Sequence, residues 1–373
     1  MRTGEPDRIR VAAGGAAGAT SATSATSATS DVWIASGILS RAADFLRSPS
    51  GRYFLFASRS ARDAVAPLRR ALDGRLALDV EFDDSERGKT LEAAGRLAGA
   101  ALAAGLRRDD AIVAAGGGVA TDLVGFAAAI ALRGVAWNAV PTTTAGMADA
   151  AIGGKTGVNL PIGKNLLGAF HPPEAILVDP DALAGLPDRD YRAGLVEACK
   201  AAWIADAELA ARLDREADAV LAREAEPLRA LLVGAIRVKA AIVASDPREA
   251  DRRQLLNFGH TLGHALEAAA GFGAMRHGEA VAWGIAAALE ISVRRAGLAE
   301  DAARRVRAVL ARFGPFPEPV RDASVLEPLI RRDKKTLSGG LSSVLLPAVG
   351  AARVDAGVPV EEWLDAAAIM SIS

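Results

Sequence analysis

The chain has 373 residues, of which 51% are hydrophobic and 24% are charged. These proportions are those of a folded globular protein and exclude a mostly disordered chain. Its 44 Lys and Arg residues nearly balance 45 Asp and Glu residues, so the overall charge favours neither a nucleic-acid partner nor an anionic membrane. The single cysteine, Cys199, excludes an internal disulfide and favours a reducing compartment, so we expect a cytoplasmic protein.

The first 30 residues begin with scattered charges and then repeat Ser, Ala and Thr between Gly14 and Ser30. Such small residues bury too little surface to offset the ordering of the backbone, so we expect residues 1–30 to form a flexible tail. The tail lacks the apolar centre of a signal peptide, and Glu5 and Asp7 argue against an organelle transit peptide. Because no later stretch reaches about 18 uninterrupted apolar residues, we expect a soluble protein without a membrane partner.

From about residue 50, short apolar runs alternate with longer amphipathic ones. The pattern predicts strands at 53–57, 76–82, 111–115 and 135–140, and helices at 61–72, 90–106 and about 118–132. Strands that alternate with helices are typical of βαβ units around a parallel sheet. We therefore predict a Rossmann-like α/β domain over residues 31–180.

After Pro180 the alternation stops, and alanine, leucine and charged residues dominate to about residue 312. This composition predicts a mainly α-helical second domain over residues 181–373, with one strand at 341–346 and a closing helix at 360–370. Because no long linker separates the halves, we expect the active site to lie in a cleft between the two domains.

Three consecutive glycines, Gly116, Gly117 and Gly118, follow the predicted strand at 111–115. Glycine lets a backbone approach a pyrophosphate closely, and the following helix N-terminus can bind the anion. The run is not the full G-x-G-x-x-G fingerprint, and a tight strand-to-helix turn without a ligand explains it equally well.

Three of the four histidines lie close together in the sequence, at His260, His264 and His277. His260 and His264 are one turn apart on a predicted helix, and His277 can meet them across a helix pair. Imidazoles with one carboxylate suit a catalytic divalent metal, and Glu197 or Glu279 could supply that carboxylate. The alternative is a set of surface imidazoles satisfied by water. The HExxH pattern is absent because Thr261 replaces its glutamate, so peptide hydrolysis is disfavoured.

Several cations lie among glycines and small polar residues, where a helix-surface role is a poor explanation. They are Lys155, Lys164, Lys200, Lys239, Arg253, Lys334 and Lys335. Ammonium groups and backbone amides can converge on a phosphate. Any one of them could be a solvated surface charge, but the group as a whole predicts a small, acidic, phosphorylated substrate.

Nine motifs in order carry a resemblance to a known family. They are Gly116-Gly-Gly-Val-Ala-Thr-Asp122, Leu132-Arg-Gly134, Pro141-Thr-Thr143, Asp149-Ala-Ala-Ile-Gly-Gly-Lys155, Gly163-Lys-Asn165, Glu197-Ala-Cys-Lys200, Leu256-Asn-Phe-Gly-His260-Thr-Leu-Gly-His264, His277-Gly-Glu279 and Asp333-Lys-Lys335. Over about residues 86–350 the chain resembles the 3-dehydroquinate synthase family, a branch of the sugar phosphate cyclases.

The resemblance implies an enzyme of the shikimate pathway that uses NAD and a divalent metal, zinc or cobalt. It would convert 3-deoxy-D-arabino-heptulosonate 7-phosphate to 3-dehydroquinate and phosphate. The implied steps are transient oxidation, β-elimination of phosphate, re-reduction, ring opening and intramolecular aldol closure. The family also implies a homodimer, because an arginine matching Arg133 can be donated by a neighbouring subunit.

The resemblance also implies roles for individual residues. Glu197, His260 and His277 match the metal ligands, and His264, Lys155, Lys200, Lys239 and Asn257 match catalytic residues. Substrate would be held by Arg133, Asp149, Lys155, Lys164, Asn165, Lys239, Arg253, Asn257, His264 and Lys335. NAD would be held by Glu86, Lys89, Gly117, Gly118, Asp122, Thr142, Thr143, Asp149 and Lys155.

Three alternatives stay open. The first is another sugar phosphate cyclase, of the valiolone, deoxyinosose or aminodehydroquinate synthase type. The second is a metal-dependent alcohol dehydrogenase of similar architecture, which would release NADH. The third is an inactive paralogue that acts as a binding protein; the intact metal-ligand motif argues against it.

Overall fold

The computed structural model describes residues 5–13, 28–246, 252–271, 273–333 and 341–372. The chain divides into two compact units, one of Met1–Pro187 with Lys239–Pro247 and one of Asp188–Val238 with Arg248–Ser373. Helix α7, Ala225–Ser245, contributes to both units. The division thus differs from the predicted limits 31–180 and 181–373, because the chain enters the second unit after Pro187 and returns to the first at Lys239.

A seven-stranded sheet forms the centre of the first unit, in the order β1-β2-β9-β6-β5-β3-β4. Its strands are β1 (Asp7–Ala13), β2 (Ala28–Ile34), β3 (Tyr53–Ser58), β4 (Leu76–Phe82), β5 (Ala111–Gly116), β6 (Ala136–Pro141) and β9 (Ala175–Val178). All neighbours from β2 to β4 are parallel. Every residue of β3 and β5 is buried, as expected for strands covered on both faces. The expected α/β domain with a parallel sheet is confirmed.

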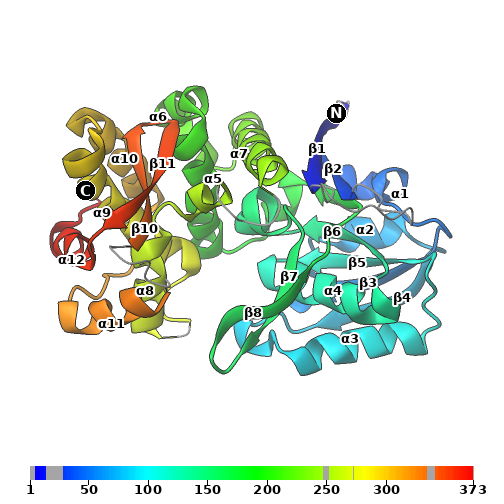
Figure 1. Cartoon of the computed structure of the whole chain (residues 1–373). Coiled ribbons are helices and arrows are strands. Elements are labelled where there is room, and N and C mark those ends of the chain that lie inside the picture. Colours follow the sequence, from blue (N-terminus) through cyan, green and yellow to red (C-terminus); the bar gives the residue numbers. More distant parts are fainter. Residues whose placement is uncertain (1–4, 14–27, 247–251, 272, 334–340, 373) are drawn as a thin grey trace, which may run out of the picture. The chain divides into compact units, whose positions relative to one another are not determined.

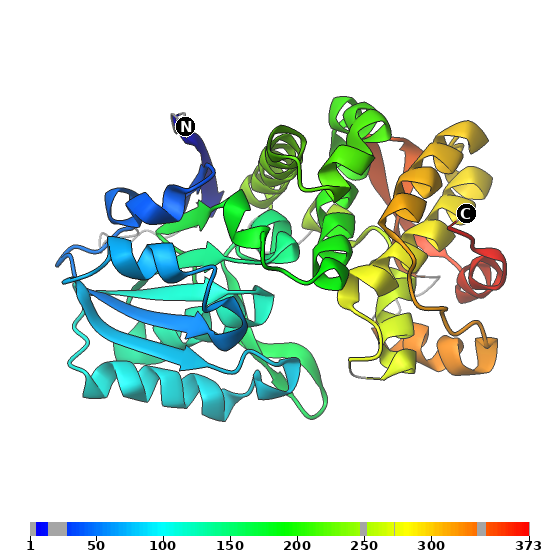
Figure 2. The same ribbon diagram turned by 180° about the vertical axis from the view of Figure 1, so that it is seen from behind.

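Helices cover both faces of this sheet (Figures 1 and 2). They are α1 (Ala42–Phe45), α2 (Ala66–Ala71), α3 (Leu91–Ala103) and α4 (Gly118–Ile130). Helices α1 and α2 lie on the face seen in Figure 2, and α3 and α4 lie on the other. This follows from right-handed crossovers, because the chain steps outward from β3 to β4 and then back across β3 to β5.

The prediction of a flexible tail is wrong for two segments, because both form strands. Strands β1 and β2 pair antiparallel from Asp7 opposite Ile34 to Ala13 opposite Ala28, and β2 joins the parallel sheet beside β9. Val11 and Ile34 are buried, so alternating apolar side chains stabilise a hairpin that composition alone did not suggest. The remainder of the tail, 1–4 and 14–27, lies outside the described residues.

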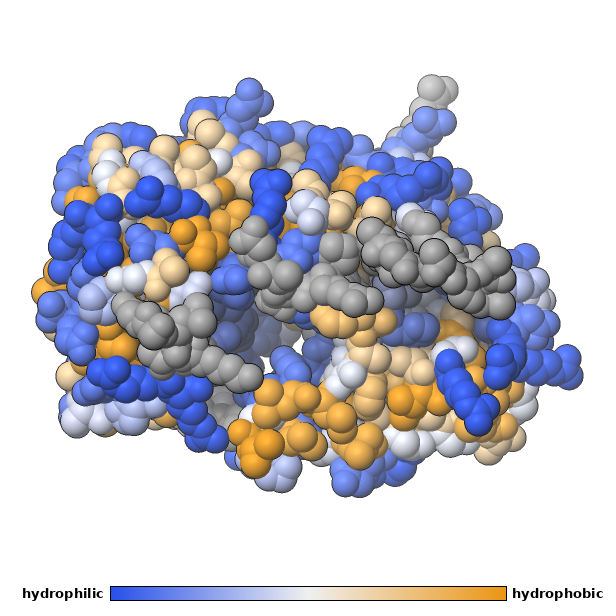
Figure 3. All heavy atoms as spheres, in the orientation of Figure 1, coloured by the Kyte–Doolittle hydropathy of each residue, from blue (hydrophilic) through white to orange (hydrophobic). Residues whose placement is uncertain are grey.

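A second antiparallel hairpin, β7 (Lys155–Leu160) and β8 (Gly163–Phe170), was not predicted, since its glycines and lysines are typical of a loop. Its outer side chains include Ile162, Leu166 and Phe170, which are 70%, 60% and 57% exposed. Apolar side chains gather in the lower centre of Figure 3, where this hairpin lies in Figure 1.

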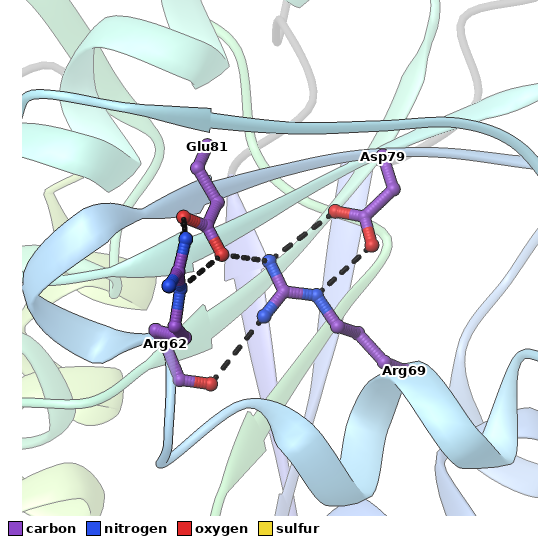
Figure 4. Close-up of polar contacts among 4 residues, drawn as sticks. All are labelled: Arg62, Arg69, Asp79 and Glu81. Atoms are coloured by element: carbon purple, nitrogen blue, oxygen red, sulfur yellow. Dashed lines mark hydrogen bonds and ion pairs between the residues drawn. The ribbon is translucent and has the colours of Figure 1, made fainter.

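The edge strand β4 carries a charged cluster on its outer side (Figure 4). The Arg62 guanidinium donates to Glu81, and Arg69 donates to both Asp79 and Glu81, at 2.9 Å and 3.1 Å. The hydrogen bonds from Arg62 hold the pKa of the Glu81 carboxyl below its usual range. Charged side chains on an edge strand disfavour pairing with a further strand.

The second unit is mainly helical, as predicted. Its helices are α5 (Asp188–Ala205), α6 (Ala207–Leu221), α8 (His260–Ala270), α9 (His277–Ile291), α10 (Glu300–Phe313), α11 (Ala323–Asp333) and α12 (Val360–Ile369). One antiparallel pair, β10 (Leu341–Ala348) with β11 (Ala351–Val358), replaces the single strand expected there. Within the described ranges, no helix combines the length and apolar character that crossing a bilayer requires.

Candidate active site

Several predicted cofactor residues follow the carboxyl ends of neighbouring parallel strands. Gly116 ends β5, and Thr142 follows β6, where its amide donates to the Gly116 carbonyl at 2.9 Å. A side chain at Gly116 would lie 2.6 Å from the Cβ of Ala120 and 2.7 Å from that of Ser58, so close packing alone requires glycine there. Gly117 caps α4 without a side chain, so it leaves room for an anion at the helix N-terminus.

A buried lysine links the predicted cofactor and substrate residues of the first unit. Lys89 is 3% exposed, and its Nζ donates to Asp122 Oδ2 and Asn165 Oδ1, each at 2.5 Å. Burial raises the pKa of the Asp122 carboxyl, although the Lys89 ammonium opposes the shift. Asn159, which sequence reasoning missed, accepts from the Asn165 amide at 2.9 Å and donates to Glu86 Oε1 at 2.7 Å. These residues therefore form one hydrogen-bonded network.

A second lysine contact of the first unit joins helix α7 to the turn before β7. The Lys239 ammonium donates to Asp149, to its backbone carbonyl and, at 2.5 Å, to its Oδ1. The turn that carries Asp149 is a short π-helical segment, Gly146–Ala150. Tertiary packing thus brings together two predicted substrate residues 90 positions apart.

The other predicted residues of the first unit lie on exposed segments. Lys155 begins β7, and Lys164 lies on β8; both side chains are exposed. Arg133 is also exposed and has a positive φ of 64°, directly after Leu132 at 50°. Two consecutive non-glycine residues in the left-handed region are strained, so this turn holds Arg133 in an uncommon conformation.

In the second unit, helix α5 buries an acid and a base one turn apart. The Lys200 ammonium donates to Glu197 Oε2 at 2.5 Å, and each side chain is 3% exposed. The other carboxylate oxygen, Oε1, is buried and has no hydrogen-bond partner among the described residues. A buried carboxylate oxygen without a partner is costly, which indicates that a further positive group belongs beside it.

Two of the three clustered histidines lie beside that oxygen, and the third lies next to them. His260 Nε2 lies 3.8 Å and His277 Nε2 lies 3.6 Å from Glu197 Oε1. The rings of His260 and His264 are 5.1 Å apart, and those of His264 and His277 are 5.8 Å apart. One ligand nitrogen from each histidine lies within 4.8 Å of the others. The structure thus brings together the three predicted metal ligands and His264, one of the predicted catalytic residues.

The electrostatic environments of two of these histidines differ. Burial, with the nearby Lys200 ammonium and the other two imidazoles, holds the pKa of His260 well below its usual value. Burial also disfavours charge on His277, but its hydrogen bond to Glu267 and the charges of Glu197 and Glu267 outweigh this and raise its pKa. His260 is therefore a neutral imidazole, the form that binds a metal.

The donor set fits a divalent ion. In tetrahedral zinc sites, nitrogen and oxygen ligands at about 2.0–2.2 Å from the ion lie roughly 3.4 Å from one another. The 3.6 Å and 3.8 Å separations between Glu197 Oε1 and the two imidazole nitrogens are close to this value. The unpartnered Oε1 and the neutral His260 are the donors that such an ion requires.

Glu279, the alternative source of the carboxylate, has other partners. Its Oε1 accepts from Arg189 Nε at 2.6 Å, and its Oε2 accepts from Arg189 Nη2 at 2.8 Å and from the Arg276 amide at 2.7 Å. The carboxylate therefore caps the first turn of α9, which His277 begins. These contacts favour Glu197 over Glu279 as a metal ligand.

Of the remaining predicted residues, two lie just before the histidines in the sequence and one lies outside the described part of the chain. Arg253 is 2% exposed, and Asn257 ends the same 3₁₀ segment, Arg252–Asn257, three residues before α8 begins at His260. Lys335 lies outside the described residues.

Sequence reasoning also missed Glu267, whose Oε2 lies 3.0 Å from His277 Nδ1. A signal for it existed, because Glu267 follows His260 by seven residues and His264 by three, which places all three on one face of α8.

Comparison with known proteins identifies the family of this chain. Two family models match the chain, 3-dehydroquinate synthase N-terminal over residues 79–193 and 3-dehydroquinate synthase C-terminal over residues 194–336. A 3-dehydroquinate synthase of Solibacter usitatus is 39% identical over 328 residues, which cover 87% of this chain and 92% of that protein. One of Geobacter metallireducens is 42% identical over 274 residues, which cover 73% and 76%.

A solved structure is similar over almost the whole chain. The 2-epi-5-epi-valiolone synthase of Streptomyces hygroscopicus, with NAD⁺ and Zn²⁺ bound, superposes with a TM-score of 0.83 at 28% identity. The match covers 93% of this chain and 98% of the synthase. Because the two family models together span more than half of the sequence and relatives near 40% identity cover most of it, the chain belongs to the 3-dehydroquinate synthase family.

Proposed function

We propose that this protein is a 3-dehydroquinate synthase. It converts 3-deoxy-D-arabino-heptulosonate 7-phosphate to 3-dehydroquinate and phosphate, with NAD and a divalent metal ion, zinc or cobalt. Family membership supports the activity. The observation that carries the proposal is the buried, unpartnered Glu197 Oε1 beside the Nε2 atoms of His260 and His277.

Glu197, His260 and His277 would hold the metal. A bound divalent ion supplies Lewis acidity toward substrate hydroxyl oxygens. Lys200 donates a hydrogen bond to one oxygen of Glu197, so that the other oxygen remains beside the imidazoles. His264, whose ring lies 5.1 Å from that of His260, is placed to move a proton at the substrate.

Glycines and threonines at the carboxyl edge of the sheet would hold NAD, which supplies a hydride acceptor and donor when bound. Gly117 and Gly118 leave the N-terminus of α4 open to the pyrophosphate, beside Thr142 and Thr143. The Lys89 network orients Asp122 and Glu86 next to this edge. Asp149 and Lys155 would lie nearest the nicotinamide.

The basic residues would bind the phosphate and carboxylate of the substrate. We assign this role to Arg133, Lys155, Lys164, Asn165, Lys239, Arg253, Asn257 and Lys335. Asp149 holds the Lys239 ammonium in place. We further propose that the protein is a cytoplasmic homodimer. Light scattering, which measures the mass of the protein in solution, would test the dimer.

A phosphate-release assay tests the activity. Purified protein with NAD and zinc should release phosphate from the heptulosonate phosphate and form 3-dehydroquinate, identified by mass spectrometry. His260→Ala should abolish both zinc retention and turnover, because it removes one of three proposed ligands. Wild-type activity in that variant would contradict the ligand assignment.

The main competing function is another sugar phosphate cyclase, since the valiolone synthase shares the fold at 28% identity. Release of phosphate from a heptulose phosphate without a carboxylate, but not from the heptulosonate phosphate, would favour that reading. Net accumulation of NADH during turnover would instead indicate an alcohol dehydrogenase.

A further inference from the structure

Glu267 lies on the side of the His277 ring opposite the proposed metal position. Its Oε2 is 3.0 Å from His277 Nδ1, while the other ring nitrogen, Nε2, lies 3.6 Å from Glu197 Oε1. The imidazole therefore lies between two carboxylates, one at each nitrogen. Of these two carboxylate oxygens, Glu197 Oε1 has no hydrogen-bond partner among the described residues, whereas Glu267 Oε2 contacts Nδ1.

A neutral imidazole carries one proton, and the nitrogen without it is the one that can bind a metal. A carboxylate at Nδ1 accepts a hydrogen bond from the Nδ1 proton and so leaves the lone pair on Nε2. His260 is arranged in the same way, because its Nδ1 lies 3.2 Å from the Phe258 carbonyl oxygen. In both rings the partner at Nδ1 directs Nε2 toward Glu197.

His277 needs such a partner more than His260 does. It is the first residue of α9, and its side chain is 44% exposed, whereas that of His260 is 12% exposed. The His277 side chain is therefore more open to solvent than that of His260. The Glu267 carboxylate is only 19% exposed and belongs to α8, the helix that also carries His260 and His264.

We propose that Glu267 is a positioning residue for the metal site: its hydrogen bond to Nδ1 fixes the tautomer and ring orientation of His277 so that Nε2 faces Glu197 Oε1. The proposal rests on the proposed function, because it concerns the same metal. Glu267 is not itself a metal ligand in this arrangement. Its charge also makes the opposite nitrogen a stronger donor, and carboxylates that support metal-binding imidazoles commonly contribute about 10- to 100-fold in affinity.

The test measures zinc affinity by competition with a chromophoric chelator in wild type, Glu267→Gln and Glu267→Ala. Glu267→Ala should bind zinc about 10- to 100-fold more weakly. Glu267→Gln keeps an acceptor for the Nδ1 proton but loses the charge, so its affinity should lie between the other two. Nitrogen NMR of the metal-free proteins, recorded at a pH where the His277 ring is neutral, should show Nδ1 protonated in wild type and Glu267→Gln, and a mixture of tautomers in Glu267→Ala.

Glu208→Ala is the matched control, because Glu208 is an exposed acid in the first turn of α6 in the same unit. It should bind zinc like wild type. Circular dichroism shows whether each variant is folded. If Glu267→Ala does not fold, the zinc affinity and the His277 ring NMR of Glu267→Gln test the positioning role.

The outcomes separate the two claims. If wild type binds no zinc, the proposed function is wrong and this inference falls with it. If wild type binds zinc and Glu267→Ala binds it equally well with an unchanged tautomer, only the positioning role is wrong. If Gln and Ala variants lose zinc equally and completely, Glu267 acts as a ligand, which also overturns the proposal.

Discussion

Replacing Lys200 with methionine tests the electrostatics of the proposed metal site. The substitution keeps an unbranched side chain but removes the ammonium that contacts Glu197 Oε2 at 2.5 Å. Both side chains are 3% exposed, so water cannot replace the lost partner. In the metal-free protein, Glu197 would then be a buried carboxylate without a hydrogen-bond partner at either oxygen.

The expected loss of stability is large. At 2.5 Å and an effective dielectric constant of 20, two unit charges attract by about 7 kcal/mol. Part of this is recovered, because the variant no longer buries an ammonium. Breaking a buried pair by removing one partner typically costs about 3–5 kcal/mol, and we expect Lys200→Met to lower the unfolding free energy of the metal-free protein by that amount.

Zinc should reduce this loss. A divalent cation beside Glu197 Oε1 replaces the missing positive charge. In the variant, the bound cation is also no longer repelled by the Lys200 ammonium. By linkage, Lys200→Met should therefore bind zinc more tightly than wild type, and zinc should stabilise the variant more than it stabilises wild type.

Urea unfolding with chelator and with saturating zinc measures both effects. The double variant Glu197→Gln with Lys200→Met is the control: it removes both charges and should be more stable than Lys200→Met alone when metal-free. A loss below about 1 kcal/mol in the metal-free single variant would refute the reasoning, as would a loss that zinc leaves unchanged.

Three further predictions concern single side chains. Cys199 is fully buried, and burial raises the pKa of its thiol. The native protein should therefore not react with a thiol reagent, whereas unfolded protein should react with one equivalent. Rapid labelling of the native protein would contradict the buried position. Glu279→Ala should lower stability by about 2 kcal/mol, because it removes charge-assisted hydrogen bonds, yet mass spectrometry should still detect one zinc ion per chain; loss of zinc would favour Glu279 as the ligand. Asp31 accepts hydrogen bonds from Arg8 at 2.9–3.1 Å. Although burial opposes it, Arg8 and Arg10 hold the pKa of the Asp31 carboxyl below its usual 3.8, so its contribution is present above that value and lost as the pH falls through the lowered pKa. Asp31→Asn should therefore cost about 1 kcal/mol or less at pH 7 and progressively less in urea unfolding below pH 4; an equal cost at pH 2.5 would contradict this account.

Local patterns in the sequence predicted much of the architecture. The strands β3, β4, β5 and β6 lie within one residue of their predicted limits, because short apolar runs between turn and helix signals are typical of buried strands. The helical second unit followed from alanine and leucine at helical spacing. Motif order was sufficient to indicate the family, since nine short matches in sequence do not depend on how the chain packs.

Other features depended on contacts between distant residues. The β1–β2 hairpin forms although its sequence resembles a tail, because pairing with β9 buries Val32 and Ile34 in the sheet. Residue type and spacing left either Glu197 or Glu279 as the metal-binding carboxylate, and only the family resemblance favoured Glu197. Tertiary packing also favours Glu197, because Arg189 contacts the Glu279 carboxylate, whereas His260 and His277 lie beside Glu197. The spacing of Glu267 from His260 and His264 indicates a shared face of α8, but its contact with His277 depends on the packing of α8 against α9. Residue type and spacing thus determine which groups a chain can offer, whereas the partner of each buried charge is decided by tertiary packing.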